Sequence, residues 1–98
     1  MEYIKLNNDI KMPILGYGVY QVTQEECEQC VLDALEVSYR SIDTAQSYFN
    51  EIQAGNAIQK SGIAREDIFL TTKVWIEHYG YEQAKSSVLE SMKKLQTD

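Results

Sequence analysis

The hydrophobic and polar positions of the chain follow two different periods, which predict short strands followed by helices. Brief alternating runs on either side of Asn7-Asn8-Asp9 predict an N-terminal β-hairpin over residues 3–12, with turn-forming residues at its centre. Apolar residues then recur at helical spacing in three later segments, and a run of β-forming residues precedes each of them. The pattern therefore predicts a hairpin followed by three β-α units.

The three predicted β-α units span residues 14–37, 39–61 and 68–96. Their strands are expected at residues 14–20, 39–44 and 68–75, and their helices at residues 23–37, 51–61 and from 81 onward. Strands that alternate with helices of this length are typical of an α/β fold with parallel strands and right-handed crossovers. A closed (β/α)₈ barrel takes eight such units, and this chain supplies three before it stops at "KKLQTD". We therefore expect a sheet that is cut short or is completed by another chain.

Composition and charge narrow the function classes. The 98 residues allow a single domain, and the net charge of −6 gives no long-range attraction to nucleic acid. No apolar run approaches the roughly 18 residues of a membrane span. The N-terminus lacks the basic start and apolar core of a signal peptide. We expect a cytoplasmic protein with neither nucleic acid nor membrane as a partner.

Two cysteines, Cys27 and Cys30, form a C-x-x-C pair, which is a redox or metal-binding pattern in some proteins. A metal site would need further ligands, and the only histidine of the chain is His78. Both cysteines also fall on the apolar stripe of the first predicted helix. We interpret them as buried reduced thiols and predict no metal site.

Three polar residues fall where parallel α/β folds build their sites. Asp43 and Lys73 lie near the carboxyl ends of the second and third predicted strands, and Tyr48 follows in the loop after the second strand. Side chains alternate faces along a strand, so Ser41 and Asp43 share a face, with Ile42 opposite. If the two strands are neighbours, a carboxylate and an ammonium meet at the mouth of the sheet beneath a tyrosine.

Such a trio has a chemical use and also an ordinary structural explanation. A tyrosine hydroxyl, with an ordinary pKa near 10, is a poor proton donor at neutral pH, and a neighbouring ammonium stabilises the phenolate. The tyrosine then becomes a general acid for a carbonyl oxygen that receives a hydride. Buried Asp–Lys pairs beside a tyrosine are more often structural. Spacing alone leaves both interpretations open.

Four stretches of the sequence resemble the aldo-keto reductases, a family of NADPH-dependent (β/α)₈ barrel enzymes. They are "LGYGVYQ" (15–21), "YRSIDTAQSYFNE" (39–51), "GNAIQKSGIAREDIFLTTKVW" (55–75) and "GYEQA" (80–84). These stretches occur in the family's order, and the resemblance extends over nearly the whole chain, including the opening hairpin. The chain most resembles bacterial members that reduce small aldehydes and ketones.

The resemblance implies a role for each matching residue. Tyr48 would be the proton donor, adjusted by Lys73 and Asp43. NADPH would be the cofactor, and the residues beside its nicotinamide end would be Gly18, Val19 and Asp43. The substrate pocket would be lined by Tyr20, Trp75 and, more weakly, Phe49.

The chain also departs from the family's pattern. Ser38 stands where the family usually has a glycine that closes the first helix with positive φ, so it must adopt a costlier conformation or a different cap. Tyr20 stands where many members have tryptophan. The family's catalytic histidine follows a fourth strand that this chain does not include. His78 has the wrong place in the motif order for that role, and we expect it to form loop hydrogen bonds or a helix cap.

We therefore interpret the chain as the hairpin and first three β-α units of a (β/α)₈ barrel. It is a piece of a complete enzyme, a short product that self-associates without catalysis, or a fragment that assembles into a partly active pseudo-barrel. We expect no turnover by these 98 residues alone and self-association through open sheet edges. The physiological substrate and the choice of NADPH over NADH depend on residues beyond Asp98.

Overall fold

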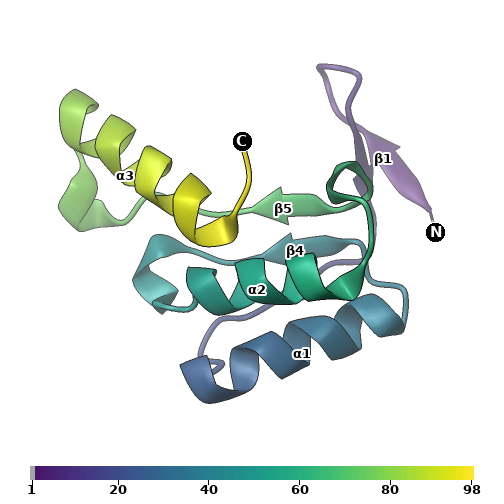
Figure 1. Cartoon of the computed structure of the whole chain (residues 1–98). Helices are drawn as coiled ribbons and strands as arrows, with labels where there is room; N and C mark the ends of the chain where they lie inside the picture. Colours follow the sequence, from purple (N-terminus) through teal and green to yellow (C-terminus); the bar gives the residue numbers. More distant parts are fainter. Residues whose placement is uncertain (1) are drawn as a thin grey trace.

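A computed structural model describes residues 2–98, so the first residue of the predicted unit 1–98 lies outside the described part. It contains two antiparallel hairpin strands followed by three parallel strands and three helices (Figure 1). The strands are β1 (Tyr3–Lys5), β2 (Lys11–Pro13), β3 (Tyr17–Gly18), β4 (Ser41–Asp43) and β5 (Phe69–Thr71). The α-helices are α1 (Gln24–Glu36), α2 (Glu51–Ser61) and α3 (Tyr81–Leu95), and the 3₁₀ turns are η1 (Gln46–Tyr48), η2 (Arg65–Asp67) and η3 (Ile76–His78).

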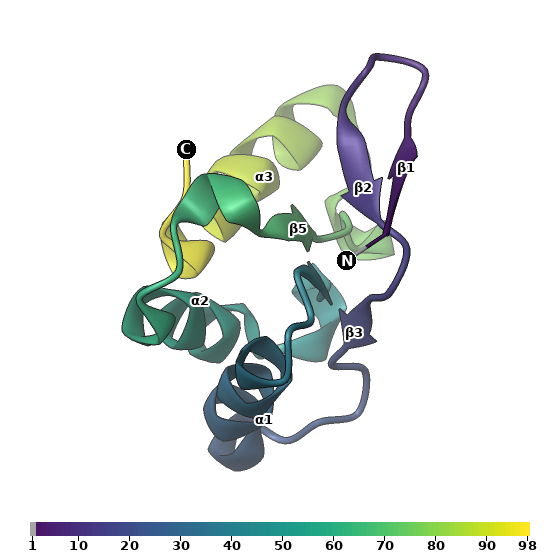
Figure 2. The same cartoon turned by 90° about the vertical axis from the view of Figure 1, so that its right-hand side faces the viewer.

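The parallel sheet has the order β3-β4-β5, which is the order of the chain. In its last paired row, Gly18 is opposite Asp43, and Asp43 is opposite Thr71. Figure 2 shows the three helices along one side of these strands. The hairpin forms a separate two-stranded sheet at the end where the parallel strands begin, as Figure 1 also shows. The opposite end of the sheet is therefore left to the loops that carry the predicted site.

The parallel strands are shorter than the sequence predicted. Hydrogen-bonded pairing covers only residues 17–18, 41–43 and 69–71 of the predicted strands at 14–20, 39–44 and 68–75. The remaining β-forming residues extend past the end of the ladder, where the pairing becomes isolated bonds. One such bond runs from the Gln46 N–H to the Lys73 carbonyl, at 3.1 Å. β-propensity describes residues suited to a pleated surface, and pairing also requires a neighbouring strand.

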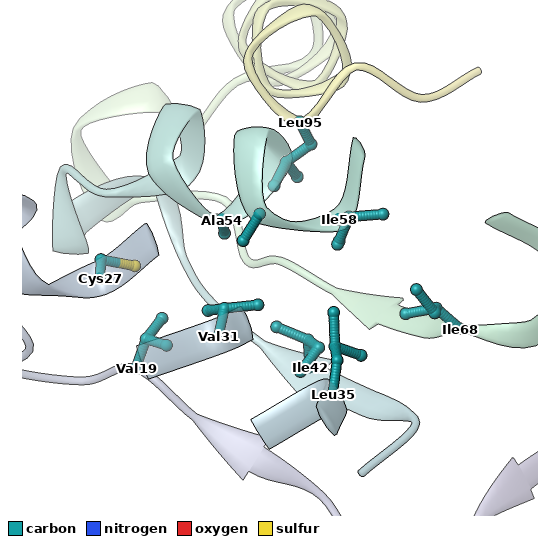
Figure 3. Packing of buried hydrophobic residues seen from close by; sticks show 10 residues of the cluster. Val19, Cys27, Val31, Leu35, Ile42, Ala54, Ile58, Ile68 and Leu95 are labelled. Atoms are coloured by element: carbon teal, nitrogen blue, oxygen red, sulfur yellow. The ribbon is translucent and has the colours of Figure 1, made fainter. Parts of the chain in front are cut away.

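The core lies between the sheet and α1 and α2. Ile42 of β4 is fully buried against Val31 and Leu35 of α1 and Ala54 and Ile58 of α2, as the close-up in Figure 3 illustrates. Ile42 is buried and Asp43 is half exposed, but Ser41, which the prediction placed on the face of Asp43, is buried as well, so burial alone does not distinguish the two faces of this strand. Sequence periodicity was sufficient to identify this packing because each helix buries a single apolar stripe.

Helix α3 approaches α2 at backbone distance. A Cβ added to Gly55 would lie 2.6 Å from the carbonyl oxygen of Lys94 and 2.8 Å from the Cα of Leu95. Only glycine permits this approach, which lets the buried Leu95 side chain reach the core.

The helix ends differ in part from the prediction. Thr23 is the N-cap residue of α1, but its hydroxyl bonds the Glu26 carboxylate at 2.9 Å instead of a backbone N–H. The sequence Thr23-Gln24-Glu25-Glu26 fits a capping box, which is right in position and wrong in its hydrogen bond. Gly62 lies where a left-handed cap of α2 belongs and adopts it, with φ 74°. Ser38 follows α1 with φ 83°, so it adopts the costlier conformation that the sequence predicted.

The two cysteines are free thiols in different surroundings. Cys27 is fully buried, whereas Cys30 is half-buried, so the expectation of two buried thiols holds only for Cys27. Burial, with smaller contributions from Cys30 and Glu28, raises the pKa of the Cys27 thiol to about 11. Cys27 is therefore a protonated core residue at neutral pH, and its Sγ contacts the Asn50 carbonyl oxygen at 3.8 Å.

The described residues 2–98 contain neither a candidate membrane span nor a candidate metal cluster. None of their helices combines the length and the apolar character that crossing a lipid bilayer requires. Among the same residues, no three His, Cys, Asp or Glu side chains are grouped in a way that could hold a metal ion.

Replacing Ser38 by glycine is expected to stabilise the chain. Ser38 is exposed, so Ser38→Gly mainly removes the steric cost of a Cβ at φ 83°. After the greater entropy of an unfolded glycine is subtracted, we expect the free energy of unfolding to rise by about 0.5–1 kcal/mol. Urea unfolding followed by circular dichroism measures this change.

Ser86 provides the matched control because it is exposed inside α3, where φ is helical. There the same substitution, Ser86→Gly, should lower the free energy of unfolding by about 0.5 kcal/mol. A loss of stability in Ser38→Gly as large as that in Ser86→Gly would contradict the strain at Ser38.

Candidate active site

An ion pair joins the ends of β4 and β5 at the mouth of the sheet. The Lys73 ammonium pairs with the Asp43 carboxylate and also donates a hydrogen bond to the Thr44 carbonyl at 3.0 Å. Lys73 lies two residues beyond Thr71, the strand partner of Asp43, so both side chains emerge on one face. Both are about half exposed, so solvent screens their attraction. The pair therefore fixes the position of the ammonium more than it stabilises the fold.

Tyr48 lies above this ion pair. It is the last residue of η1, and the Lys73 Nζ is 5.4 Å from the centroid of its ring. The Tyr48 N–H closes the 3₁₀ turn on the Ala45 carbonyl at 3.1 Å, and the half-buried ring packs against the core. The structure thus brings the three predicted catalytic residues, Asp43, Tyr48 and Lys73, into one cluster.

Aromatic side chains flank Tyr48 in two separate pairs. The exposed ring of Tyr20 lies 5.3 Å from the ring of Tyr48, between centroids. Phe49, at φ 58°, turns the other way and meets Trp75 edge to face at 5.4 Å. The three residues predicted to line the substrate pocket therefore form two separate contacts. Tyr20 packs on Tyr48, whereas Phe49 and Trp75 pack on each other.

Phe49 and Trp75 line a groove of about 760 Å³ between the loops and α3. The cluster of Asp43, Tyr48 and Lys73 does not line this groove. The groove therefore adjoins the predicted chemistry without containing it, and its apolar wall is the Phe49–Trp75 pair.

The three residues predicted to lie beside the cofactor differ in their exposure. Gly18 is exposed, lies opposite Asp43 in the sheet, and has open space where a Cβ would be. Val19 is fully buried in the core, and its N–H and carbonyl are bonded to Asp43 and Asn50 respectively. Val19 therefore has no exposed surface in this structure, and its predicted place beside the nicotinamide stays a prediction.

His78 takes the role expected of it. It ends the short turn η3, and its Nδ1 lies 2.8 Å from the side-chain oxygen of Gln46. Its ring also meets Trp75 edge to face at 5.9 Å. His78 is therefore part of the loop framework behind Trp75, at a distance from the Asp43–Lys73 pair.

The sequence analysis missed Asn50, which connects three segments around the site. Its buried side chain accepts a hydrogen bond from the Thr44 hydroxyl at 2.8 Å and donates to the carbonyls of Val19 and Val22 at 3.1 and 3.3 Å. The only sequence feature that singles out Asn50 is its position directly before α2, and an asparagine at that position suggests a helix cap. The side chain makes no cap hydrogen bond and instead joins the strand ends.

Glu51 and Gln46 were also missed. Glu51 is buried, and its carboxylate accepts a hydrogen bond from the Thr72 hydroxyl at 2.7 Å, which joins α2 to the segment after β5. Gln46 is buried, and its side chain bonds to the segment from Trp75 to His78 and to Ser91 of α3. Both residues are polar and lie next to Tyr48 in the chain, but nothing in their spacing distinguishes a buried polar group from an exposed one.

Comparison with known proteins places this site in a family. The profile of the Aldo/keto reductase family matches residues 14–98. The glyoxal reductase of Bacillus subtilis is 44% identical over 96 residues, which cover 97% of this chain and 35% of that protein. The aldo-keto reductase of Mycobacterium avium is 47% identical over 95 residues, covering 97% of this chain and 33% of that protein. The chain belongs to the aldo/keto reductase family, and its members' oxidoreductase chemistry suits the cluster described above.

Solved structures agree with this assignment. An aldo/keto reductase from Brucella melitensis superposes with a TM-score of 0.96 at 49% identity, covering 99% of this chain and 37% of that one. A Bombyx mori aldo-keto reductase solved in complex with NADP gives a TM-score of 0.93 at 34% identity, with coverages of 99% and 35%. The chain spans about a third of the length of the curated relatives it matches.

Replacing Asn50 by leucine tests its role as a clamp. Asn50→Leu keeps the side chain's approximate size but leaves the buried Thr44 hydroxyl and the carbonyls of Val19 and Val22 without this partner. We expect the free energy of unfolding to fall by about 2–4 kcal/mol, as measured by urea unfolding.

The control is Asn56→Leu on α2, where the asparagine makes one exposed hydrogen bond to Gln96. We expect a change there within about 0.5 kcal/mol. Equal effects of the two substitutions would show that Asn50 is not a clamp.

Proposed function

We propose that this chain supplies the hairpin and the first three β-α units of an aldo-keto reductase (β/α)₈ barrel. The complete protein reduces an aldehyde or ketone to an alcohol with NADPH, and Tyr48 is its general acid. The observation that carries the proposal is the position of the Lys73 ammonium, which is paired with Asp43 and 5.4 Å from the Tyr48 ring centroid. The small dicarbonyl named for the B. subtilis relative suggests a small carbonyl compound as substrate.

The three catalytic residues divide the work. Tyr48 Oη donates its proton to the carbonyl oxygen of the substrate as negative charge develops there. The Lys73 ammonium stabilises the charge left on Oη, and Asp43 keeps the ammonium in place. The hydrogen bond from Lys73 to the Thr44 carbonyl adds a second fixed contact, so the ammonium is oriented before a substrate binds.

The residues at the mouth of the sheet fit a nicotinamide cofactor. The half-exposed Asp43 carboxylate is an acceptor suited to a ribose hydroxyl, and Gly18 beside it leaves open space for close approach. When bound, NADPH supplies the hydride that the carbonyl carbon accepts. Tyr20, which lies over Tyr48, and the Phe49–Trp75 pair would line the approach of the substrate.

Tyr48→Phe tests the proposal in a complete barrel. We would join this chain in frame to the C-terminal two-thirds of the B. subtilis glyoxal reductase and follow the loss of NADPH absorbance with glyoxal. The substitution removes the donated proton, so we expect kcat to fall by about 10²–10⁴-fold. Binding of NADPH, measured by fluorescence titration, should change little.

Tyr79→Phe is the matched control because Tyr79 is an exposed tyrosine on the far side of η3. It should keep the activity of the joined protein. Unchanged kcat in Tyr48→Phe, with the joined protein active, would contradict the assignment of the general acid.

A second function is favoured by a different observation. The outer strands β3 and β5 each pair on one side only. Ile76 and Tyr79 are exposed in the segment between β5 and α3, and Tyr81 is exposed at the start of α3. We infer that the 98-residue chain, taken alone, self-associates through these surfaces as a scaffold without turnover.

Sedimentation tests this second function. The 98-residue chain should have a mass above 11.3 kDa that rises with concentration, because open strand edges and exposed apolar surface favour association. Substitution of the exposed Tyr81 by lysine should lower the mass, whereas Tyr3→Lys in the hairpin should not. A monomer at every concentration would exclude this function without affecting the test of Tyr48.

A further inference from the structure

We infer that Gln46 is a positioning residue that holds Trp75 against the site and thereby sets the affinity for the carbonyl substrate. This inference rests on the proposed function, in which Trp75 lines the approach to Tyr48. Gln46 begins the turn η1 that ends in Tyr48, and its side chain is buried. It thus connects the catalytic tyrosine to the opposite loop.

The side-chain amide of Gln46 makes three hydrogen bonds to that loop and to α3. Its Oε1 accepts from the backbone N–H of Trp75 at 2.8 Å and lies 2.8 Å from His78 Nδ1. Its Nε2 donates to the hydroxyl of Ser91, a buried residue of α3, at 3.2 Å. Gln46 therefore fixes both ends of the short segment from Trp75 to His78.

The orientation of this amide follows from its partners. A backbone N–H only donates, so the atom of Gln46 that faces Trp75 must be the oxygen. Since the same oxygen also faces His78, the proton of the neutral imidazole must lie on Nδ1. The amide nitrogen is then left for Ser91. A side chain without a polar acceptor at this position leaves the Trp75 N–H and His78 Nδ1 without this partner.

A fourth hydrogen bond separates substrate binding from catalysis. The backbone N–H of Gln46 donates to the Lys73 carbonyl at 3.1 Å. This bond does not involve the side chain, so it is retained in Gln46→Met and Gln46→Glu. The Asp43–Lys73 pair and the turn that holds Tyr48 therefore stay together in a Gln46 variant, while Trp75 loses its anchor. Removing the amide should weaken substrate binding and leave proton transfer largely intact.

The closing experiment uses Trp75 as its own probe, because it is the only tryptophan of the 98-residue chain. Gln46→Met keeps the length of the side chain and removes the three bonds of the amide. We expect a red shift of the Trp75 emission and an increase of about twofold in the acrylamide quenching constant, because the loop opens locally. Gln46→Glu keeps the acceptor for the Trp75 N–H, and the Ser91 hydroxyl can donate to it, so its spectrum should stay close to that of the original chain.

Gln59→Met is the control, because Gln59 is exposed in the last turn of α2. It should leave the emission and the quenching unchanged. Circular dichroism verifies that each variant is folded. If Gln46→Met is folded and its Trp75 emission and quenching match those of Gln59→Met, the inference is overturned. If Gln46→Met does not fold, Gln46→Ser decides by the same two readouts.

Steady-state kinetics of the joined barrel provide a second test of the role of Gln46. Gln46→Met should raise KM for glyoxal about tenfold with kcat within about twofold, and Gln46→Glu should restore most of the affinity. A fall in kcat with unchanged KM would overturn the positioning role. An inactive joined barrel with intact Gln46 would count against the proposed function, whereas the fluorescence arm would still decide the role of Gln46.

Discussion

The buried side chain of Asn50 is the constraint on which the arrangement of the site depends. It accepts from Thr44 at the end of β4 and donates to carbonyls in the loop after β3, while its own backbone begins α2. Two strand ends and one helix start are thus fixed by one amide, and neither end can move without leaving a polar group unpaired in the core. The clamp joins Thr44, which directly follows Asp43, to Asn50, two residues after Tyr48, so it holds the segment that carries both of these site residues.

A second buried amide, that of Gln46, connects the site to the loop that carries Trp75. Gln46 joins the turn of Tyr48 to the loop of Trp75 and to α3. The cluster of Asp43, Tyr48 and Lys73 contains charged and aromatic side chains that water can reach. Its geometry is held by the buried amide side chains of Asn50 and Gln46. Amides suit this role because one side chain can both donate and accept hydrogen bonds.

Much of the fold could be predicted from the sequence, because one-sided burial leaves a period that residues reveal. The stripe around Val31 and Leu35 and the alternation at Ile42 gave the helices and the strands. Asp43, Tyr48 and Lys73 could be placed together because parallel strands end at a common edge. The strand lengths, the burial of Val19 and the roles of Asn50 and Gln46 could not be predicted. These features depend on contacts between residues that are distant in the sequence. The local spacing of residues gives no information about such contacts.

The order of the parallel strands has a consequence for how the chain acquires its structure. Since β3, β4 and β5 are neighbours in the order in which they occur in the chain, each β-α unit packs mainly on the one before it. A chain that emerges from the ribosome can therefore add each unit to a surface that is already present, without waiting for distant partners. The clamp of Asn50 uses no residue beyond the start of α2, so it can form before the segment that carries Lys73 has left the ribosome. The turn that carries Tyr48 can therefore be in place before the charge proposed to act on it.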